Sequence, residues 1–203
     1  MDGFTVLLGP DFAGKSTVLG HLARAGWHCV SYDDEFLPAD CGLVAELRDG
    51  FLGRALRGPH SADFVVTILQ TAVVHLRDEI GRAGGKPVAV DSYYYKILAK
   101  CLLTGLVNDA LLGWWRTFPK PARVVYLDTD LAEAWRRSGD GQRLNRFEHY
   151  GDAPTWPGFR RFQTDLRERV FAEIRGLPVH VVPRGDARLA LTALTGGDDV
   201  RAA

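Results

Sequence analysis

This sequence contains little cysteine and methionine, and it has no net charge. Its 203 residues include 3 Cys and 1 Met, and 25 Lys and Arg side chains balance 25 Asp and Glu side chains. The cysteines, Cys29, Cys41 and Cys101, are too far apart for a metal motif and odd in number, so we expect reduced thiols in a reducing compartment. A net charge of zero provides no global field toward nucleic acid or an anionic membrane. The sequence therefore predicts neither partner, and anion binding must be local.

Long apolar runs are missing as well. The first apolar run begins at Phe4, which leaves no room for a secretory signal, and no uninterrupted run approaches the length of a membrane span. We therefore expect a cytoplasmic protein. A chain of this length with 46% hydrophobic residues can bury one good core, and it shows no internal repeat and no linker. The sequence predicts a single domain over residues 1–195 and a frayed tail over 196–203.

The stretch 4–17, F-T-V-L-L-G-P-D-F-A-G-K-S-T, carries the strongest functional signal. An apolar run of strand composition ends at Gly9, and Gly14-Lys15-Ser16 opens a segment that can continue as a helix. This is a Walker A phosphate loop in its expected context. Its glycines permit a tight turn, so that backbone N–H groups and the positive end of the helix converge on a phosphate chain. A chance match is the alternative, but chance rarely adds both a strand before and a helix after the motif.

The side chains of this loop are of the types that bind a nucleotide and its metal ion. Lys15 would reach the β- and γ-phosphates of ATP, and the Ser16 hydroxyl would ligate Mg²⁺. The loop residues expected to contact the nucleotide are Gly9, Asp11, Ala13, Gly14, Lys15, Ser16 and Thr17. The sequence therefore predicts ATP and Mg²⁺ as cofactors.

Apolar runs alternate with helical patterns along the rest of the chain. Strands are predicted at 4–8, 27–32, 87–91, 123–127 and 179–182. Helices are predicted at 17–25, 43–56, 62–82, 106–117, 131–137, 159–175 and 185–195, and a further helix follows the three tyrosines at 93–95 and ends at about 103. Strands separated by helices imply a mainly parallel sheet with helices on both faces. The predicted fold class is α/β, a five-stranded phosphate-loop NTPase fold with a mobile lid. In the helix 62–82, the apolar residues Phe64, Ile68, Val73 and Leu76 should face the sheet.

Acidic residues follow two of the predicted strands. Asp33, Asp34 and Glu35 come after the second strand, and Asp91 ends the third. The carboxyl ends of parallel strands face the ligand crevice in an open α/β sheet, so these acids should lie beside the phosphate loop. Asp91 fits the Walker B role, in which a carboxylate holds Mg²⁺ directly or through water. A solvated loop or a helix cap is the alternative for each acid.

Two further segments suggest an acceptor pocket and a lid. Tyr93 and Tyr94 could line an acceptor pocket with flat faces and hydroxyls, or could pack beneath it. The glycine-interrupted segment at about 136–150 is basic, which predicts a mobile lid whose guanidinium groups close over the triphosphate. The lid arginines singled out are Arg137, Arg143 and Arg146. The alternative is an exposed helix-turn-helix with solvated arginines.

These motifs resemble those of the thymidylate kinase group of nucleotide kinases. The acid at the third position of the phosphate loop, Asp11, resembles that group's loop. V-D-S-Y-Y-Y-K resembles its D-R-Y motif, and Y-L-D-T-D followed by L-N-R-F-E resembles its lid, in the expected order over about 4–175. The resemblance implies a five-stranded parallel core, a lid, magnesium ATP as donor and often a homodimer.

The acceptor side departs from that family. Thymidylate kinases grip the acceptor's phosphate with three arginines, where this chain reads Asp33-Asp34-Glu35, Q-T-A-V at 70–73 and D-S-Y at 91–93. A phosphate dianion among carboxylates, without guanidinium partners, would be repelled. The sequence therefore predicts a neutral or cationic acceptor that presents a hydroxyl. An acid after the second strand also resembles deoxynucleoside kinases and uridine kinase-like enzymes, a resemblance that makes Asp33 or Asp34 the general base.

The leading hypothesis is an ATP-dependent kinase that transfers the γ-phosphate to a hydroxyl of a nucleoside-like or other small molecule. The catalytic residues expected are Lys15, Asp33, Asp91, Arg143 and Arg146; the acceptor contacts are Asp11, Asp33, Asp34, Tyr93 and Tyr94; the metal ligands are Ser16 and Asp91. One alternative is a thymidylate kinase whose phosphate grip is rebuilt from Arg48, Arg54 or Arg57. Another is a nucleotide-binding regulatory protein that transfers no phosphate. The chain has no N-K-x-D segment for guanine, which disfavours a GTPase.

Overall fold

Five strands form one sheet in the computed structural model, which describes residues 3–32, 36, 45–55 and 58–195. The strands are β1 (Thr5–Leu8), β2 (His28–Val30), β3 (Val88–Asp91), β4 (Arg123–Asp128) and β5 (Val179–Pro183). Their order is β2-β3-β1-β4-β5, and every pairing is parallel. The predicted α/β class with a five-stranded parallel sheet is confirmed.

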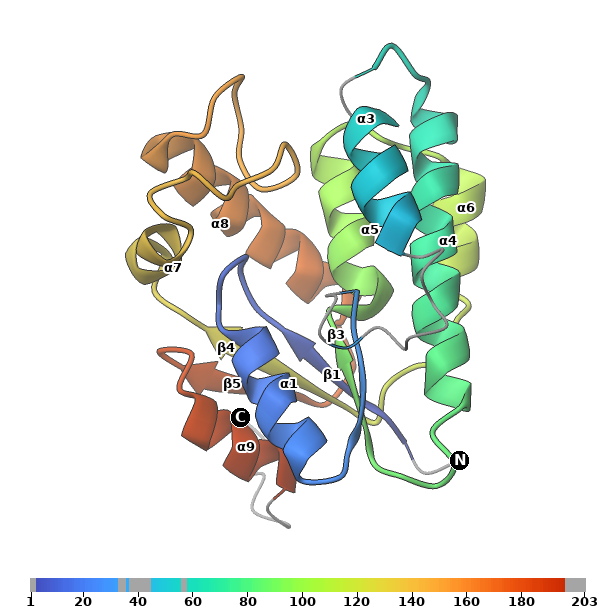
Figure 1. Ribbon diagram of the computed structural model, residues 1–203, viewed down its shortest axis with the longest axis vertical. Helices are drawn as coiled ribbons and strands as arrows, with labels where there is room; N and C mark the ends of the chain where they lie inside the picture. Colours follow the sequence, from blue (N-terminus) through green and yellow to red (C-terminus); the bar gives the residue numbers. More distant parts are fainter. Residues whose placement is uncertain (1–2, 33–35, 37–44, 56–57, 196–203) are drawn as a thin grey trace.

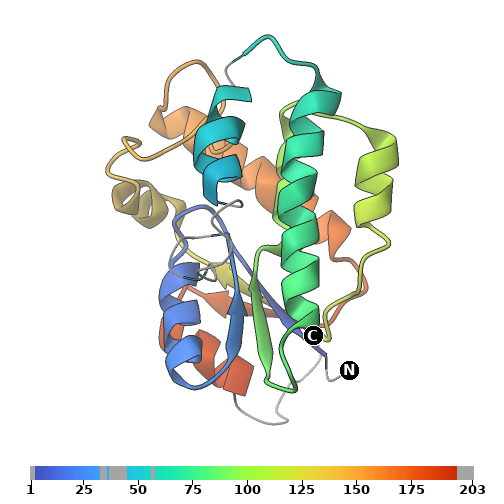
Figure 2. The same cartoon turned by 45° about the vertical axis from the view of Figure 1, so that its right-hand side comes forward.

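Helices cover both faces of this sheet (Figures 1 and 2). They are α1 (Lys15–Arg24), the π-helical turn η2 (Leu47–Leu52), α3 (Gly53–Ala55), α4 (Ala62–Gly81), α5 (Tyr93–Leu103), α6 (Asp109–Trp115), α7 (Leu131–Arg137), α8 (Trp156–Glu173) and α9 (Ala187–Thr195). Helices α1 and α9 lie on one face, and α4, α5 and α8 lie on the other. The predicted lid, at about 136–150, begins at the end of α7 and continues in the segment between α7 and α8. Residues 196–203, the predicted tail, lie outside the described part.

The alternation of side chains along β1 divides the core between the two faces. Leu7 packs in the cluster that includes α1 and α9, whereas Val6 and Leu8 pack in the cluster that includes α4 and α5. Successive side chains of a strand point to opposite faces, so a run that is apolar throughout belongs to a strand buried on both sides. The apolar run that marked β1 in the sequence therefore reflects its central place in the sheet.

Helix α4 shows one error in the predicted core. Its start is capped, because the Ser61 hydroxyl accepts a hydrogen bond of 3.2 Å from the Phe64 backbone N–H. Val73 and Leu76 are buried against the sheet, but Phe64 is 48% exposed and its ring stacks on His60. The next residues, Val65 and Val66, are buried, so Phe64 lies on the exposed side of the helix and its prediction as a core residue was wrong.

The sheet order brings the predicted site together. Strand β3 lies directly beside β1, with Asp91 in register with Leu7, so the end of β3 meets the loop that follows β1. Because all five strands are parallel, their carboxyl ends share one edge of the sheet. Within the described part of the chain, no helix is both long and apolar enough to cross a membrane.

Candidate active site

The loop between β1 and α1 has the backbone geometry that its glycines predict. Gly9 has φ +154°, and a Cβ there would lie 2.9 Å from the Leu127 carbonyl oxygen, so a side chain would collide with β4. Gly14 has φ +93° and is the N-cap of α1. Phe12, between them, has φ 62°, a left-handed conformation that is uncommon for a residue with a side chain. The loop therefore folds back tightly over the start of the helix.

The N-terminus of α1 opens at the centre of this loop. Gly14 offers no side chain to cap it, and the first turn contains no acidic residue. The first backbone N–H groups of a helix have no partner within the helix, and the helix dipole makes this end positive. The loop and helix thus present the geometry of a phosphate site.

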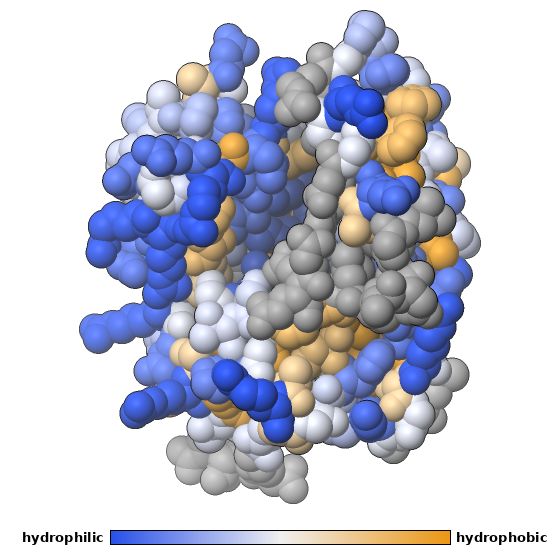
Figure 3. All heavy atoms as spheres, viewed as in Figure 1, coloured by the Kyte–Doolittle hydropathy of each residue, from blue (hydrophilic) through white to orange (hydrophobic). Residues whose placement is uncertain are grey.

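A cavity of about 680 Å³ lies over this end of the helix. Figure 3 shows it as a hollow with hydrophilic residues in its depth. Its wall comes from the phosphate loop 11–17, from Tyr32 after β2, from α4 and α5, and from Arg137, Arg143 and Glu148. Residues far apart in the sequence therefore meet around one space.

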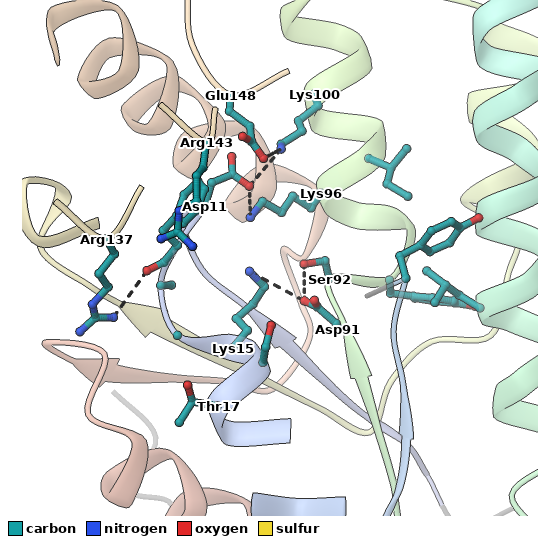
Figure 4. A pocket seen from close by; sticks show the side chains of 18 residues that line it. Asp11, Lys15, Thr17, Asp91, Ser92, Lys96, Lys100, Arg137, Arg143 and Glu148 are labelled. Carbon is teal, nitrogen blue, oxygen red and sulfur yellow. Dashed lines mark hydrogen bonds and ion pairs between the residues drawn. The ribbon is translucent and has the colours of Figure 1, made fainter. Parts of the chain in front are cut away.

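Lys15 and Asp91 face each other in this cavity (Figure 4). The Nζ atom of Lys15 lies 3.8 Å from Oδ1 of Asp91. The Ser92 hydroxyl donates to the same oxygen at 2.7 Å, and the Ser31 hydroxyl donates to Oδ2 at 3.4 Å. The carboxylate is held in place by hydrogen bonds from the ends of both β2 and β3.

The oxygen atoms present fit a magnesium site. Ser16 and Asp91 both line the cavity, and the described residues contain no group of three or more His, Cys, Asp or Glu that could hold a metal alone. Mg²⁺ usually takes one or two carboxylates plus substrate phosphates and water. One hydroxyl and one carboxylate beside a phosphate loop are therefore a suitable partial ligand set, which a nucleotide would complete.

The start of α5 carries backbone strain next to Asp91. Ser92 and Tyr93 have φ values of 59° and 46°, so two consecutive residues with side chains are left-handed. Such conformations cost on the order of 1–3 kcal/mol each and often occur at functional sites. The Ser92 N–H donates to the Leu7 carbonyl oxygen at 2.9 Å, which ties this turn to the end of β1.

Two lysines of α5 that no sequence motif marked as site residues also line the cavity. The Nζ atoms of Lys96 and Lys100 lie 2.8 Å and 3.0 Å from the same oxygen, Oδ1 of Asp11. Lys100 is also 3.7 Å from Glu148 in the segment before α8. Their spacing of four residues, starting one turn after Asp91, was the available signal, because residues i and i+4 share one side of a helix.

Gln163 of α8 holds the other side of Asp11. The Asp11 backbone N–H donates to Oε1 of Gln163 at 2.9 Å, and the Gln163 amide donates back to Oδ2 of Asp11 at 2.8 Å. The same amide donates to the Glu148 carbonyl oxygen at 3.1 Å. The sequence placed Asp11 in both the nucleotide and the acceptor site; it lies at the cavity wall, with its carboxylate engaged by Lys96, Lys100 and Gln163.

Burial and charge shift the pKa values in this cluster. Burial alone would raise the pKa of Asp11, but the attraction of Lys100, Lys96 and Lys15 outweighs it and holds the pKa below its usual range. Burial lowers the pKa of Lys96 to about 7, opposed by Asp11 and assisted by repulsion from Lys15 and Lys100. Burial also raises the pKa of Glu148, and the charge of Asp11 adds to that effect. Asp11 is therefore the firmly ionised acid at the centre of the cluster.

These lysines add positive charge to the described wall of the cavity. Among the residues that the structure describes, the cationic Lys96 and Lys100 lie in this wall beside the acidic Asp11 and Glu148. The predicted acids Asp33, Asp34 and Glu35 and the arginine Arg57 lie outside the described residues. The prediction of a neutral or cationic acceptor rested on Asp33 and Asp34 together with Asp91, so it stays a prediction.

The predicted lid arginines separate into two groups. Arg137 donates to the Phe12 carbonyl oxygen at 3.5 Å, and the Arg143 guanidinium lies 5.1 Å from the centre of the Phe12 ring. Both line the cavity and contact the phosphate loop (Figure 4). Arg146 instead lines a different cavity of about 300 Å³ with His60 and His149, so its placement at the nucleotide was wrong. Arg146 comes three positions after Arg143, and the irregular chain there turns it to the other side.

The two tyrosines also separate. Tyr93 lines the cavity, although its side chain is fully buried. Tyr94 is fully buried in the core, where its hydroxyl accepts a hydrogen bond of 2.5 Å from Lys120, so its prediction as an acceptor contact was wrong. Of the predicted nucleotide contacts, Gly9 shapes the loop from behind, whereas the residues from Asp11 to Thr17 line the cavity itself.

Comparison with known proteins supports this architecture. No family model and no curated protein matches the chain. Among solved structures, the chain is similar to thymidylate kinase from Candida albicans, with a TM-score of 0.60, 16% identity, and coverage of 95% of this chain and 88% of that one. It is also similar to deoxyadenosine kinase from M. mycoides with bound dCMP and dCDP, with a TM-score of 0.58, 12% identity and coverage of 94% and 93%. A structure of the same enzyme with bound dATP is similar with a TM-score of 0.56, 14% identity, and coverage of 94% of both chains.

These identities are low, so the likeness concerns the fold. The chain has the fold shared by thymidylate kinase and deoxynucleoside kinase, and its phosphate loop lies where the parallel strands end. The resemblance drawn from the motifs is thereby confirmed for the fold.

Proposed function

We propose that this protein is a kinase that transfers the γ-phosphate of magnesium ATP to a small-molecule acceptor. The observation that carries the proposal is the meeting of Lys15 and Asp91, 3.8 Å apart, in a cavity over the N-terminus of α1. A phosphate loop alone would serve binding, but a carboxylate opposite its lysine supplies the second half of a phosphoryl-transfer site. The similar deoxyadenosine kinase binds dATP, which agrees with a nucleoside triphosphate in this cradle.

Each residue has a defined task in this proposal. Lys15 and the backbone N–H groups of the loop bind the β- and γ-phosphates, and Ser16 and Asp91 hold Mg²⁺, which neutralises charge on the phosphates. Arg137, the last residue of α7, and Arg143, in the segment after it, line the cavity and stabilise the charge of the transferred group. These groups are positioned before reaction, which is how electrostatic stabilisation lowers a barrier.

The acceptor would lie against α4 and α5. Tyr32, Leu76, Tyr93 and Ile97 contribute an apolar wall there, which suits a flat ring such as a nucleobase. Asp33 and Asp34 follow Tyr32 in the sequence and remain our proposal for the general base toward an acceptor hydroxyl. We retain a homodimer as a prediction from the family resemblance.

Acceptor-stimulated ATP turnover tests this function. Purified protein with ATP and Mg²⁺ would be given nucleosides, nucleoside monophosphates and other hydroxylated metabolites one at a time, and ADP release would be followed. A kinase shows turnover that rises and saturates with its acceptor and that stops when Mg²⁺ is chelated. ATP binding with no stimulation by any member of the panel would favour the regulatory, non-transferring alternative.

A further inference from the structure

Helix α5 presents two adjacent rows of side chains to the cavity. Tyr93 and Ile97 form an apolar row, and Lys96 and Lys100 form a cationic row beside it. Residues four apart share one side of a helix, so each row runs along the helix axis. Figure 4 shows Lys96 nearer to Lys15 and Lys100 farther along α5. The cationic row therefore runs along the cavity wall from beside Lys15 toward Glu148.

The cationic row has fewer hydrogen-bond partners than it can use. The side chain of Lys96 is only 7% exposed, and within the described chain its one ion-pair partner is Asp11. An ammonium group has three N–H donors. Lys100 shares the same Asp11 oxygen at 3.0 Å and reaches Glu148 at 3.7 Å. Lys96 is thus a buried cation with donors left over at the wall of a cavity.

The charges around the row leave room for an added anion. Asp11 faces it from the phosphate loop, Lys15 from α1 and Glu148 from the segment before α8. Burial lowers the pKa of Lys96 to about 7, so its positive charge is poorly compensated, and burial raises the pKa of Glu148. An anionic ligand next to Lys96 would offset the desolvation of that ammonium and use its remaining donors.

We propose that the acceptor carries an anionic oxygen group, a phosphate or a carboxylate, that Lys96 and Lys100 bind from α5. The apolar row of Tyr93 and Ile97 would hold the neighbouring apolar part of the same molecule. The inference rests on the proposed kinase function in naming this ligand as the acceptor. It replaces the neutral or cationic acceptor predicted from the sequence with an anionic one.

Lysine-selective NMR tests the subsite directly. The chain has five lysines, so ¹³C-labelled lysine side chains give few signals, and Lys96→Met identifies the Lys96 signal by its loss. The donor site is first filled with Mg²⁺ and a non-hydrolysable ATP analogue, and the protein is then titrated with inorganic phosphate, with acetate or with glycerol. We expect either anion to move the Lys96 and Lys100 signals and to raise the pKa of Lys96, while glycerol leaves them unchanged. The exposed Lys86 is the internal control.

Two NMR results would overturn the proposal. In one, neither anion shifts the Lys96 signal. In the other, the ATP analogue alone produces the whole shift and the added anions contribute nothing, which would assign Lys96 to the donor phosphates. A shift with phosphate but not with acetate would support the subsite and identify phosphate as its ligand.

Matched acceptors then separate this inference from the kinase function. Affinities are measured for nucleosides and their monophosphates, with the donor analogue bound. We expect the wild type to prefer the anionic member at least about tenfold, since a charge-assisted hydrogen bond supplies that much. Lys96→Met should remove the preference, Lys96→Arg should keep much of it and Lys86→Met should leave it unchanged.

The two ideas fail in different ways. Phosphoryl transfer to neutral acceptors, with equal rates in wild type and Lys96→Met, would end the anionic-acceptor inference and leave the kinase intact. Lys96-dependent anion binding in a protein that transfers phosphate to nothing would keep the anion subsite and end the kinase proposal.

Discussion

Lys15 of the phosphate loop and Asp91 at the end of β3 lie 3.8 Å apart, although they are 76 positions apart in the sequence. The contact follows from the sheet order, because β3 is hydrogen-bonded to β1 and both strands end at the same edge. In the free protein, Asp91 keeps the lysine ammonium paired. With nucleotide bound, we propose that Lys15 turns to the phosphates and Asp91 to Mg²⁺.

Replacing Lys15 should abolish most of the activity while the fold remains. In Lys15→Met an apolar chain of similar length fills the space, but the phosphates lose a cation. We expect kcat to fall by about 10²–10³-fold, the typical effect of removing one preorganised charge-stabilising group. Lys86→Met is the matched control, because Lys86 is exposed and remote from the cavity. Near-normal turnover in Lys15→Met would remove this residue from the mechanism.

Asp91→Asn should raise the Mg²⁺ concentration needed for half-maximal activity and lower the maximal rate. A neutral amide is a weaker ligand for a hard cation than a carboxylate. Asp128→Asn is a suitable comparison, because Asp128 ends the neighbouring strand β4 but is exposed and lies outside this cavity. Titration of activity with Mg²⁺ measures the effect, and identical curves for Asp91→Asn and wild type would contradict the metal assignment.

The basic segment should show a sharp division between its arginines. Arg137→Ala and Arg143→Ala each remove a guanidinium that contacts Phe12 at the cavity, and we expect kcat/KM to fall by about 10²-fold or more. Arg136→Ala and Arg146→Ala should change it little. Arg136 pairs with Glu133 on the surface, and Arg146 lines the other cavity. A loss in Arg146→Ala as large as that in Arg143→Ala would restore the original prediction for Arg146.

Gln163→Leu should destabilise the protein. The substitution leaves the buried Asp11 backbone N–H without its partner and removes a donor from the Asp11 carboxylate. An unsatisfied buried polar group costs about 1–3 kcal/mol of unfolding free energy. Thr164→Ala, at the exposed neighbouring position, should have a much smaller effect. Urea unfolding of both variants measures the difference, and equal midpoints would show that the contact adds no stability.

Stability should rise with pH just above neutrality because of Lys96. The pKa of Lys96 is lowered to about 7 in the folded protein, from about 10.5 in an unfolded chain. Between these values the unfolded state binds more protons, so the free energy of unfolding increases with pH. From pH 7 to pH 8.5, the free energy of unfolding of wild type should therefore increase relative to that of Lys96→Met, which lacks this titrating group. A constant difference over this range would show that the pKa of Lys96 is not lowered.

The phosphate loop and sheet were predictable because their signals are local. A strand, a glycine turn and a helix start are contiguous in 4–17, and the local sequence determines the backbone conformation of each. Asp91 was predictable because the carboxyl ends of parallel strands all lie at the same edge of the sheet, so an acid at the end of β3 must lie near the loop that follows β1.

The errors concern orientation. Which of the three consecutive tyrosines faces the cavity depends on the phase of α5, and that phase is set by the left-handed turn at Ser92 and Tyr93. The same phase places Lys96 and Lys100 in the wall, a placement that their spacing suggested only once the cavity side of the helix was known. Arg146 lies in an irregular segment, where no period relates one side chain to the next.

The most direct test of the central claim is transfer of a labelled γ-phosphate from ATP to a separated acceptor product, measured in parallel for wild type and Lys15→Met. We predict a labelled product that requires Mg²⁺ and that forms at least about 10²-fold more slowly in the variant. Label that never leaves ATP except as inorganic phosphate, or a product that forms equally fast in Lys15→Met, would contradict the assignment of this site to phosphoryl transfer.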